Sequence, residues 1–474
     1  MSFLSREEFK LLANADLDKL YDYLTEKFNV LEVKIEKQIQ VILVQESRIK
    51  ELEARLNQNS KNSHKPPSSD IFKKERDRKT SRRKSGGQTG HEGSNLKMVA
   101  NPTDTKEYPA PENCEKCNQS LVEIQGKSKV GQEYTLPKME ISIIEHKVES
   151  KKCSCGHTNI SSNAPVIKNH AYYGNEFKSF IIYLKNHHML PFGRIKELIK
   201  DVFGHTVSEG TIWNCEKEIS KRLLPIEHTI KQEIIDGNVA CFDETGTRSE
   251  KKNFWVHVAV TPNFSHFSFH NKRGFDGMIA SGILPNFKGT AVHDFFKPYL
   301  KFECKHSFCN AHLLRELIGA HETTKQVWTE MMLGVLITGL DARKESISET
   351  ASMDILKMYD KAIQMGFQEN PDIDVGKKKS SSKVVNLLRR MDRYKEGILK
   401  FLFTTDVPFD NNLAERALRM FKVKNKISGC FRNSQSGEFF CRLRSFIDTC
   451  KKQKLPILDS ILYVFNFSSF QFSK

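Results

Sequence analysis

The sequence predicts a multidomain α+β protein, in which an N-terminal coiled coil, a small cysteine-containing domain and a helical region precede an α/β domain. Three observations support this prediction. Apolar residues recur at heptad spacing near the N-terminus, two close cysteine pairs follow, and short strand-like segments that end in acidic residues occupy the middle of the chain. With 474 residues, of which 38% are hydrophobic, the chain can form several domains with sizeable cores, and a wholly disordered chain is excluded.

A heptad pattern extends through the first 58 residues. Alternate steps of four and three residues visit Leu17, Tyr21, Leu24, Phe28, Leu31, Ile35, Gln38, Ile42, Gln45, Ile49, Leu52 and Leu56. Mostly β-branched or aromatic residues at a positions, with leucine at d positions, favour a parallel dimer, and the two glutamines would set its register at a cost in stability. We therefore predict a coiled-coil dimerisation helix over residues 1–58. A long helix packed on its own protein's core is the alternative.

A basic linker is predicted over residues 59–105. Turn and helix-breaking residues fill the stretch from Asn57 to Asp70, and residues 61–97 hold eleven Lys or Arg against four Asp or Glu. The whole chain carries a formal net charge of +16, so a polyanion is the expected partner. Such a linker can follow a phosphate backbone through counterion release, although a merely solubilising role explains the composition too.

Two cysteine pairs define a small domain over residues 106–165. A Cys-x-x-Cys pair is followed, after strand-like residues near 141–144, by a Cys-x-Cys pair. Two thiol pairs on turns that flank a hairpin can hold a tetrahedral Zn²⁺, and a full cysteine set makes such a site structural. The predicted ligands are Cys114, Cys117, Cys153 and Cys155. His146 or His157 is an alternative fourth ligand, and free surface thiols are the alternative to any metal site.

Residues 166–232 are predicted to be helical. A helix over residues 192–203 ends before Gly204, and a second helix begins after Ser208, whose hydroxyl suits an N-cap. Helix, short turn, helix is the spacing of helix-turn-helix DNA-binding modules, but any helical hairpin has the same pattern. The region therefore fits DNA binding and an ordinary structural role alike.

Residues 233–452 have the pattern of an α/β domain. A buried strand is expected to end at Asp243, and two antiparallel strands follow over residues 254–270. A second short apolar strand ends at Asp294, and a fifth strand is expected at 306–309. The order β-β-β-α-β-α-β, with an acid at the ends of the first and fourth strands, predicts a ribonuclease-H-like sheet.

Two aspartates are too few for a site in which two Mg²⁺ ions act on one phosphate. Glu415 is the candidate third acid, because Asp410 or Asn411 would cap a helix whose early turns contain it. The basic residues that follow are candidates for DNA phosphate contacts: Arg416, Arg419, Lys422, Lys424 and Lys426. Each residue also has a structural explanation, the aspartates as turn initiators, Glu415 as partner of a nearby arginine, and the basic residues as a solvated helix face.

Four motifs in this order resemble transposases of the insertion sequence 66 family. They are Asp243-Glu244-Thr245-Gly246, Val292-His293-Asp294 with Tyr299, the stretch from Cys309 to Glu316, and the stretch from Asp410 to Arg419. The coiled coil, the stretch from Asn62 to Asp70 and the paired cysteines also resemble parts of that family. The resemblance therefore covers nearly the whole chain.

The resemblance implies a DDE transposase of a bacterial insertion sequence, which cleaves DNA strands at the element ends and transfers them. Asp243, Asp294 and Glu415 would bind catalytic Mg²⁺ or Mn²⁺ ions, one activating a water or a DNA 3′-hydroxyl and the other stabilising the leaving oxygen. A helical insertion would occupy about residues 313–405, and residues 453–474 would be a C-terminal tail. Cys309 and His312 would either bind metal or brace the helix after the fifth strand.

The expected partners are double-stranded DNA at the element ends and target, a second copy of the chain in a homodimer or higher multimer, and companion proteins of the same element. The charged N-terminus and the absence of an apolar run long enough to span a bilayer predict a soluble, non-secreted protein without membrane contact. The resemblance implies that it is a cytoplasmic, nucleoid-associated bacterial protein. Two alternatives are a non-catalytic, domesticated DNA-binding regulator and a metal-dependent nuclease without strand transfer.

Overall fold

The computed structural model describes residues 6–15, 17–56, 58, 96–164, 170–344, 348–371, 383–467 and 469–472. The chain divides into two units, which are treated separately below. One comprises Met1–Ile71, Tyr173–Pro191 and Trp213–Lys474, and the other comprises Phe72–Tyr172 and Phe192–Ile212. Most of the predicted basic linker lies outside the described residues. Within the described residues, no helix is long and apolar enough to cross a membrane.

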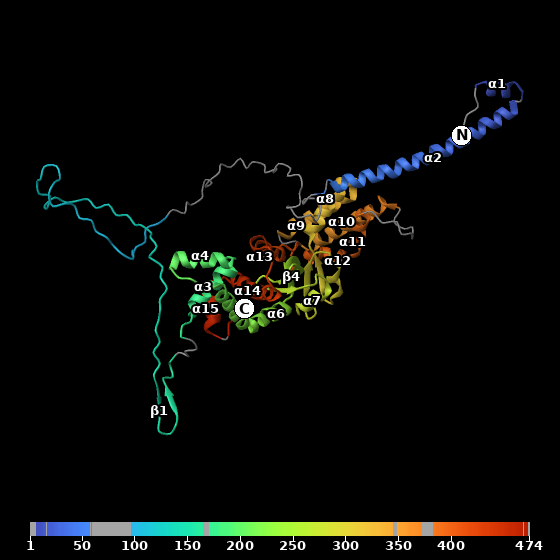
Figure 1. Ribbon diagram of the computed structural model, residues 1–474. Helices are drawn as coiled ribbons and strands as arrows, with labels where there is room; N and C mark the ends of the chain where they lie inside the picture. Colours follow the sequence, from blue (N-terminus) through green and yellow to red (C-terminus); the bar gives the residue numbers. More distant parts are fainter. Residues whose placement is uncertain are drawn as a thin grey trace. The chain divides into compact units, whose positions relative to one another are not determined.

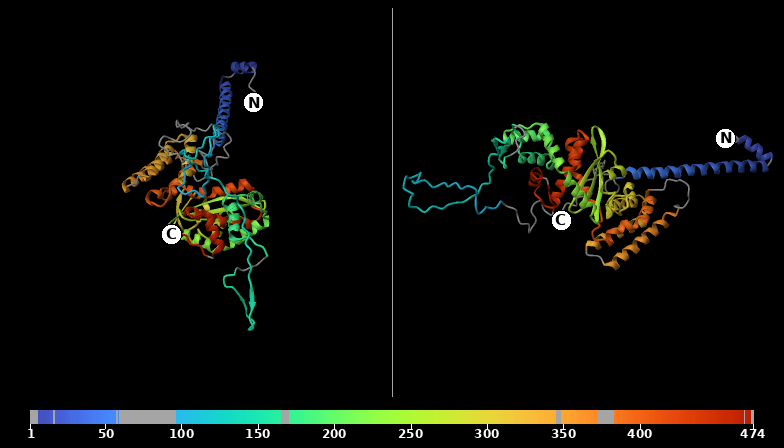
Figure 2. Two further views of the ribbon diagram at one scale, coloured as in Figure 1. Left: turned by 90° about the vertical axis from the view of Figure 1, so that its left-hand side faces the viewer. Right: turned by 90° about the horizontal axis from the view of Figure 1, so that it is seen from below.

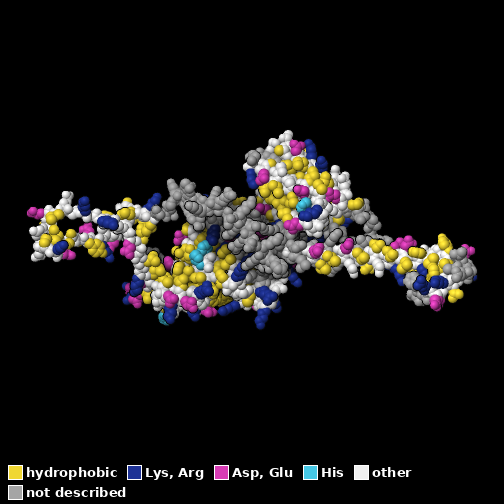
Figure 3. Space-filling view, turned by 90° about the horizontal axis from the view of Figure 1, so that it is seen from above, with side chains coloured by type: hydrophobic (Ala, Val, Ile, Leu, Met, Phe, Trp, Pro, Cys, Tyr) yellow, Lys and Arg dark blue, Asp and Glu magenta, His cyan; other side chains and the backbone are white. Residues whose placement is uncertain are grey.

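Helix α2 (Leu17–Leu56) is a single helix of 40 residues, and a short helix α1 (Arg6–Ala15) precedes it (Figure 1). Apolar side chains of the heptad seam are exposed in the single chain, among them Ile35 at 54% and Ile42 at 52%. The space-filling view shows hydrophobic side chains along the surface of this helix (Figure 3). The helix is confirmed, and its pairing with a second copy stays a prediction.

The cysteine-containing segment has little regular structure between residues 96 and 164. Strands β1 (Ser150–Lys152) and β2 (Thr158–Ile160) form a short antiparallel hairpin. The strand predicted near residues 141–144 does not form, and Ile143 is 94% exposed. Its apolar alternation was misleading because no other element of this segment offers a surface that could bury it.

Helices occupy the chain from residue 175 to residue 235, as predicted. They are α3 (Asn175–Ile182), which continues into a π-helical turn η2 (Tyr183–His187), α4 (Phe192–Phe203), α5 (Glu209–Arg222) and α6 (Leu224–Ile235). Helix α4 ends at Gly204, whose φ of 65° is the left-handed conformation that glycine adopts without steric cost. The Ser208 hydroxyl accepts a hydrogen bond of 3.0 Å from the backbone N–H of Thr211, so Ser208 caps α5 as predicted.

Five strands form one mixed sheet in the order β5-β4-β3-β6-β7. Their bounds are β3 (Val239–Ser249), β4 (Lys252–Val260), β5 (Ser265–His270), β6 (Thr290–His293) and β7 (Lys305–Phe308). Strands β3, β4 and β5 are antiparallel neighbours, whereas β6 runs parallel to both β3 and β7. The predicted helix before β6 is α7 (Phe275–Ala280), but a 3₁₀ helix η3 (Lys297–Lys301) replaces the α-helix predicted between β6 and β7.

Strand β3 does not end at Asp243, as predicted, but continues to Ser249. Residue-by-residue pairing with β4 extends to the pair Ser249 and Lys252. The reversal is a tight turn at Glu250 and Lys251, both of which have positive φ angles. Asp243 therefore lies inside a strand. At this position β3 is still paired with its antiparallel neighbour β4, whereas its pairing with the parallel strand β6 has ended at Cys241.

Alternate strand residues contribute to two core clusters, one on each face of the sheet. Cys241, Val258 and Val292 pack with one set of helices, and Ala240 and Phe242 pack with the other. The first set includes the predicted insertion, and its helices form a compact group beside the sheet (Figure 2). The insertion helices are α8 (Asn310–Thr324), α9 (Val327–Lys344), α10 (Glu349–Gln368), α11 (Lys383–Arg393) and α12 (Lys395–Phe403).

Three helices complete the chain: α13 (Asn412–Ser428), α14 (Ser434–Lys452) and α15 (Ile457–Asn466). The prediction that residues 453–474 form a tail was wrong, because α15 buries Ile461, Val464 and Phe465 in the second core cluster. Apolar residues three and four apart in this segment mark an amphipathic helix. Ile226 and Ile230 of α6 belong to the same cluster, so part of the predicted helical region packs with the sheet.

Candidate active site

Asp243 lies within β3, and Asp294 directly follows the end of the adjacent parallel strand β6. The pairing of β3 with β6 is recorded up to Cys241 and Val292, and each aspartate follows two residues later. Adjacent strands are about 4.8 Å apart, and residues two apart on a strand point to the same face. Because Cys241 and Val292 share one core cluster, Asp243 belongs to that face of the sheet, and the charge of Asp294 acts on it.

Glu415 approaches the same face from the first turn of α13. The side-chain amide of Asn411 donates to the carbonyl oxygen of Phe242 at 2.8 Å, and its backbone N–H donates to the Cys309 sulfur at 3.2 Å. These two bonds fix the start of α13 against β3, next to Asp243. Asn411 occupies the N-cap position, while the Asp410 carboxylate accepts the backbone N–H of Asn412 at 3.0 Å.

The carboxyl group of Asp243 has a pKa raised to about 8. Burial is the largest cause, the charge of Glu244 comes next, and the charges of Asp294 and Glu415 raise the pKa further. A hydrogen bond of 2.8 Å from the backbone N–H of Glu244 opposes the shift. Acids crowded in this way cannot all ionise at low cost unless a cation joins them, so the residues fit a divalent ion with oxygen ligands.

We expect the metal-free protein to lose stability between about pH 4 and pH 8 through Asp243. The raised pKa stabilises the folded state fully below the unfolded value of 3.8, and this contribution disappears as the pH rises through about 8. Asp243→Asn removes the titration, so the melting temperature of the variant relative to wild type should rise with pH across this window. Thermal denaturation in a chelator measures this difference, and a pH-independent difference would contradict the assignment.

The neighbouring Glu244 has different partners. Its carboxylate accepts a hydrogen bond of 2.7 Å from the Tyr299 hydroxyl and an ion-pair contact of 3.0 Å from Nε of Arg273. The Arg273 guanidinium lies 5.0 Å from the ring centroid of Trp255 and 4.3 Å from that of Phe296. Sequence reasoning missed Arg273, because 29 residues separate it from Glu244 and no local pattern links them.

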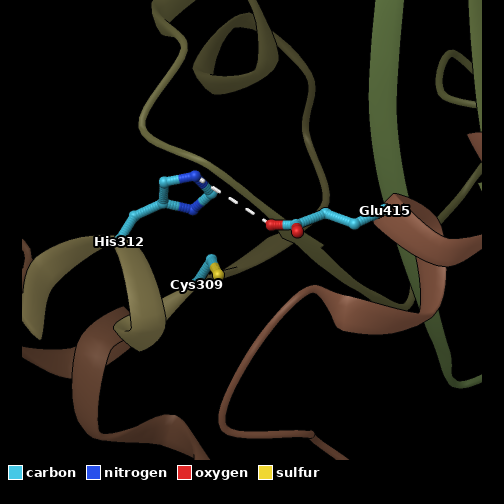
Figure 4. A group of neighbouring side chains, drawn as sticks. All are labelled: Cys309, His312 and Glu415. Atoms are coloured by element: carbon cyan, nitrogen blue, oxygen red, sulfur yellow. Dashed lines mark ion pairs between the residues drawn. The ribbon is translucent and has the colours of Figure 1, made fainter. Parts of the chain in front are cut away.

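A second group of side chains adjoins Glu415. The ligand atoms of Cys309, His312 and Glu415 all lie within 4.8 Å of one another, and Figure 4 shows the imidazole directed toward the carboxylate. Nε2 of His312 is 4.0 Å from a carboxylate oxygen of Glu415. Among the described residues, no other group of three His, Cys, Asp or Glu side chains is this close. The three acids of the proposed triad therefore do not form so close a group, and two ions about 3.5–4 Å apart can bridge a wider spacing.

The four predicted zinc ligands remain as two separate pairs. The side chains of Cys114 and Cys117 interact, as do those of Cys153 and Cys155. Hydrogen bonds from backbone groups, led by Lys116 and Cys155 respectively, lower the pKa of Cys114 and of Cys153. Within residues 96–164, no three of these or other metal-binding side chains gather within 4.8 Å. The zinc site stays a prediction.

The predicted DNA-binding residues of α13 divide into two groups. Those that are exposed are Arg416, Arg419, Lys422 and Lys426. Three of them follow Glu415 at intervals of four, seven and eleven residues, which places them on its side of the helix. Lys424 is partly buried and its ammonium group contacts the Ser428 hydroxyl at 2.9 Å. Burial, followed by the charge of Lys185, lowers the pKa of Lys424 to about 8.

Comparison with known proteins decides the family. A family model described as Transposase IS66 family matches residues 170–439, which is more than half of the chain. The chain belongs to this family. The matched residues include the three acids, Cys309 and His312, and all five basic residues of α13. As a member of the IS66 transposase family, the protein has a transposase role and acts on DNA.

The N-terminal part has a separate match. Residues 13–97, which include α2, match a family of unknown function, DUF6444. Neither family match covers the four predicted zinc ligands, which lie between residues 114 and 155. No curated protein matches the chain.

Proposed function

We propose that the protein cleaves DNA strands at the ends of an insertion sequence and joins them to a target, with Asp243, Asp294 and Glu415 as its acidic triad. One observation carries the proposal: Asp243 lies in β3 beside the end of its parallel neighbour β6, Asp294 directly follows β6, and the start of α13, which carries Glu415, is bonded to β3. The raised pKa of Asp243 supports a site that needs divalent cations. The IS66 family match supports DNA as the substrate.

The proposed fold of the catalytic domain, residues 233–452, is ribonuclease-H-like. Three antiparallel strands followed by two parallel strands, in the order β5-β4-β3-β6-β7, support this proposal. The helices from α8 to α12 would be its insertion, between the second and third acids. Residues 1–58, 59–105, 106–165 and 166–232 would serve as dimerisation helix, basic linker, zinc-binding domain and DNA-binding region.

In the proposed mechanism, the carboxylates of Asp243, Asp294 and Glu415 would hold the metal ions that act on the scissile phosphate. Bound Mg²⁺ or Mn²⁺ would supply the positive charge that activates the attacking hydroxyl and stabilises the leaving oxygen. The exposed cations of α13 then bind flanking phosphates and align the strand with the acids. Asn411 positions Glu415 through its bonds to Phe242 and Cys309.

Strand transfer distinguishes this proposal from its alternatives. In a first reaction, the purified chain is incubated with Mg²⁺ and with DNA that contains the protein's own coding sequence and the regions on either side of it, where the element ends would lie. In a second reaction, the DNA substrate is replaced by ends that have already been cut. A transposase gives cleaved DNA and joined product, a nuclease gives cleavage alone, and a DNA-binding regulator gives neither. Joined product that is absent at every Mg²⁺ and Mn²⁺ concentration would rule out the proposal.

We expect Arg419→Met to weaken binding to duplex DNA and Lys424→Met to leave it nearly unchanged. Arg419 is exposed one turn beyond Glu415, whereas Lys424 is partly buried against Ser428. Loss of one phosphate contact should reduce the slope of log affinity against log salt concentration by about 0.9. Titrations at several salt concentrations measure the slope, and equal slopes for the two variants would remove Arg419 from the DNA contact surface.

A further inference from the structure

We propose that Cys309, His312 and Glu415 form a second metal site, for Zn²⁺ or a similar ion, and that its occupancy withdraws Glu415 from the Mg²⁺ site. Metal binding by this group stands on its own geometry. Its inhibitory effect rests on the proposed function, because Glu415 matters to catalysis only if it belongs to the acidic triad.

The chemistry of the three ligands selects the metal. A thiolate and an imidazole favour Zn²⁺ and Co²⁺, whereas Mg²⁺ prefers oxygen ligands in an octahedral arrangement. Asp243 and Asp294 offer only oxygen atoms. Glu415 is the one residue of the triad that also lies within 4.8 Å of a sulfur and a nitrogen ligand. The two sites therefore differ in metal preference and share one carboxylate.

The geometry needs little adjustment to hold an ion. Metal–ligand bonds of about 2.0–2.3 Å in a tetrahedral site place ligand atoms roughly 3.4–3.6 Å apart. The His312 and Glu415 atoms are 4.0 Å apart, and the whole group lies within 4.8 Å (Figure 4). Side-chain rotations of about 1 Å close the difference. Three protein ligands leave a fourth position for water, the pattern of an exchangeable site rather than a closed structural one.

Two rigid elements hold these ligands. Cys309 is the N-cap of α8, and its sulfur accepts the backbone N–H of Asn411 at 3.2 Å. The next residue, Asn310, anchors the strand end through bonds of 3.0 Å to the carbonyl oxygens of Phe409 and Ile398. The ends of β7 and α13 are thereby fixed to each other. The ligands are arranged before an ion arrives, which lowers the cost of binding.

Access and charge also favour a cation. The Cys309 side chain is buried, while those of His312 and Glu415 are 20% and 31% exposed, so an ion can enter from their side. The charges of Glu415 and Asp410 act on Cys309 and would attract a cation. The thiol releases its proton to solvent as the metal–sulfur bond forms. Glu415 then has an oxygen bound to the soft ion, and the Mg²⁺ site retains two aspartates.

Cobalt absorption in the full-length chain tests the binding claim without DNA or Mg²⁺. Co²⁺ bound to thiolate absorbs in the near ultraviolet, and the predicted N-terminal cysteine site would contribute to this signal too. The measurement is therefore the difference between wild type and variants. We expect Cys309→Ser to lose one equivalent of thiolate-bound Co²⁺ and the control Cys430→Ser, an exposed cysteine outside the group, to lose none. Identical titrations for wild type and Cys309→Ser would overturn the site.

A second variant guards against misfolding. His312 is partly exposed, and His312→Gln should raise the dissociation constant of this Co²⁺ equivalent more than about tenfold while the melting temperature of the metal-free protein stays near that of wild type. An unchanged dissociation constant in a folded His312→Gln variant would also overturn the site.

Mn²⁺ release measured by electron paramagnetic resonance tests the shared carboxylate. Zn²⁺ should release bound Mn²⁺ from the wild type and leave it bound in Cys309→Ser. Equal release from both proteins, or release from neither, would overturn the inhibitory role while the cobalt result stands. If neither protein binds Mn²⁺, the proposed function fails together with the inhibition, and the cobalt titration still decides whether the second site exists.

Discussion

Asp243→Asn is expected to reduce Mg²⁺-dependent strand cleavage by more than about 100-fold and to change DNA affinity by less than a few-fold. The substitution removes a charged metal ligand at the centre of the proposed site, and even residues that only orient ligands typically contribute 10–100-fold. Asp243 lies inside β3 and is partly buried, whereas the cations of α13 that would contact phosphates are exposed. Cleavage of labelled DNA and fluorescence anisotropy measure the two quantities.

The matched control is Glu244→Gln, which alters the neighbouring carboxylate. Its partners are Tyr299 and Arg273, and burial, the largest cause, raises its pKa. The glutamine side chain keeps the oxygen that accepts the tyrosine hydroxyl, so this variant should retain far more activity than Asp243→Asn. If both variants lose activity equally, or if Asp243→Asn loses DNA affinity in parallel with cleavage, Asp243 is not acting as a metal ligand.

The sheet was predictable because its strands carry local signals. Residues 265–270 alternate between apolar and polar side chains, as expected for a strand with one buried face. The short apolar run before Asp294 is typical of a strand that is buried on both faces. The end of β3 was not predictable from the same signals. Glu244, Thr245 and Gly246 resemble a turn in isolation. Only their pairing with His257, Val256 and Trp255 of β4 keeps them extended.

The sequence predicted which residues belong to the candidate site, but not how they are arranged in space. Asp243 and Asp294 follow apolar strand residues, and this pattern can be recognised from the sequence alone. The parallel register that aligns them, and the bond from Asn411 to the Phe242 carbonyl that brings Glu415 near, depend on residues far apart in the chain. The sequence likewise does not separate Lys424 from its exposed neighbours, because its burial depends on residues outside α13.

Two of the wrong predictions have opposite causes. The apolar spacing of residues 457–466 is helical, so the sequence does contain a signal against the predicted tail. Residues 141–144 carried a strand pattern, but the surrounding segment has no core against which a strand could pack. A periodic pattern thus predicts an element only where another surface can bury its apolar side.

Ile35→Lys combined with Ile42→Lys is expected to convert the protein to monomers at concentrations where the wild type self-associates. Both isoleucines are at a positions of the heptad seam and are about half exposed in the single chain. Burial of one isoleucine contributes about 1.5–3 kcal/mol, so two losses per chain should raise the dissociation constant at least about 100-fold. Sedimentation equilibrium of the full-length chain measures the change.

Val33→Lys is the control for this prediction, because Val33 is also aliphatic and half exposed, at 50%, but lies on the opposite side of α2 from the seam. It should leave the mass in solution unchanged. A wild-type chain that is monomeric at every concentration would remove the coiled-coil assignment. If cleavage survives in the monomeric double variant while joining of paired ends is lost, the exposed seam serves to bring two DNA ends together. It would then not be needed to build the proposed catalytic site, whose three acids come from one chain.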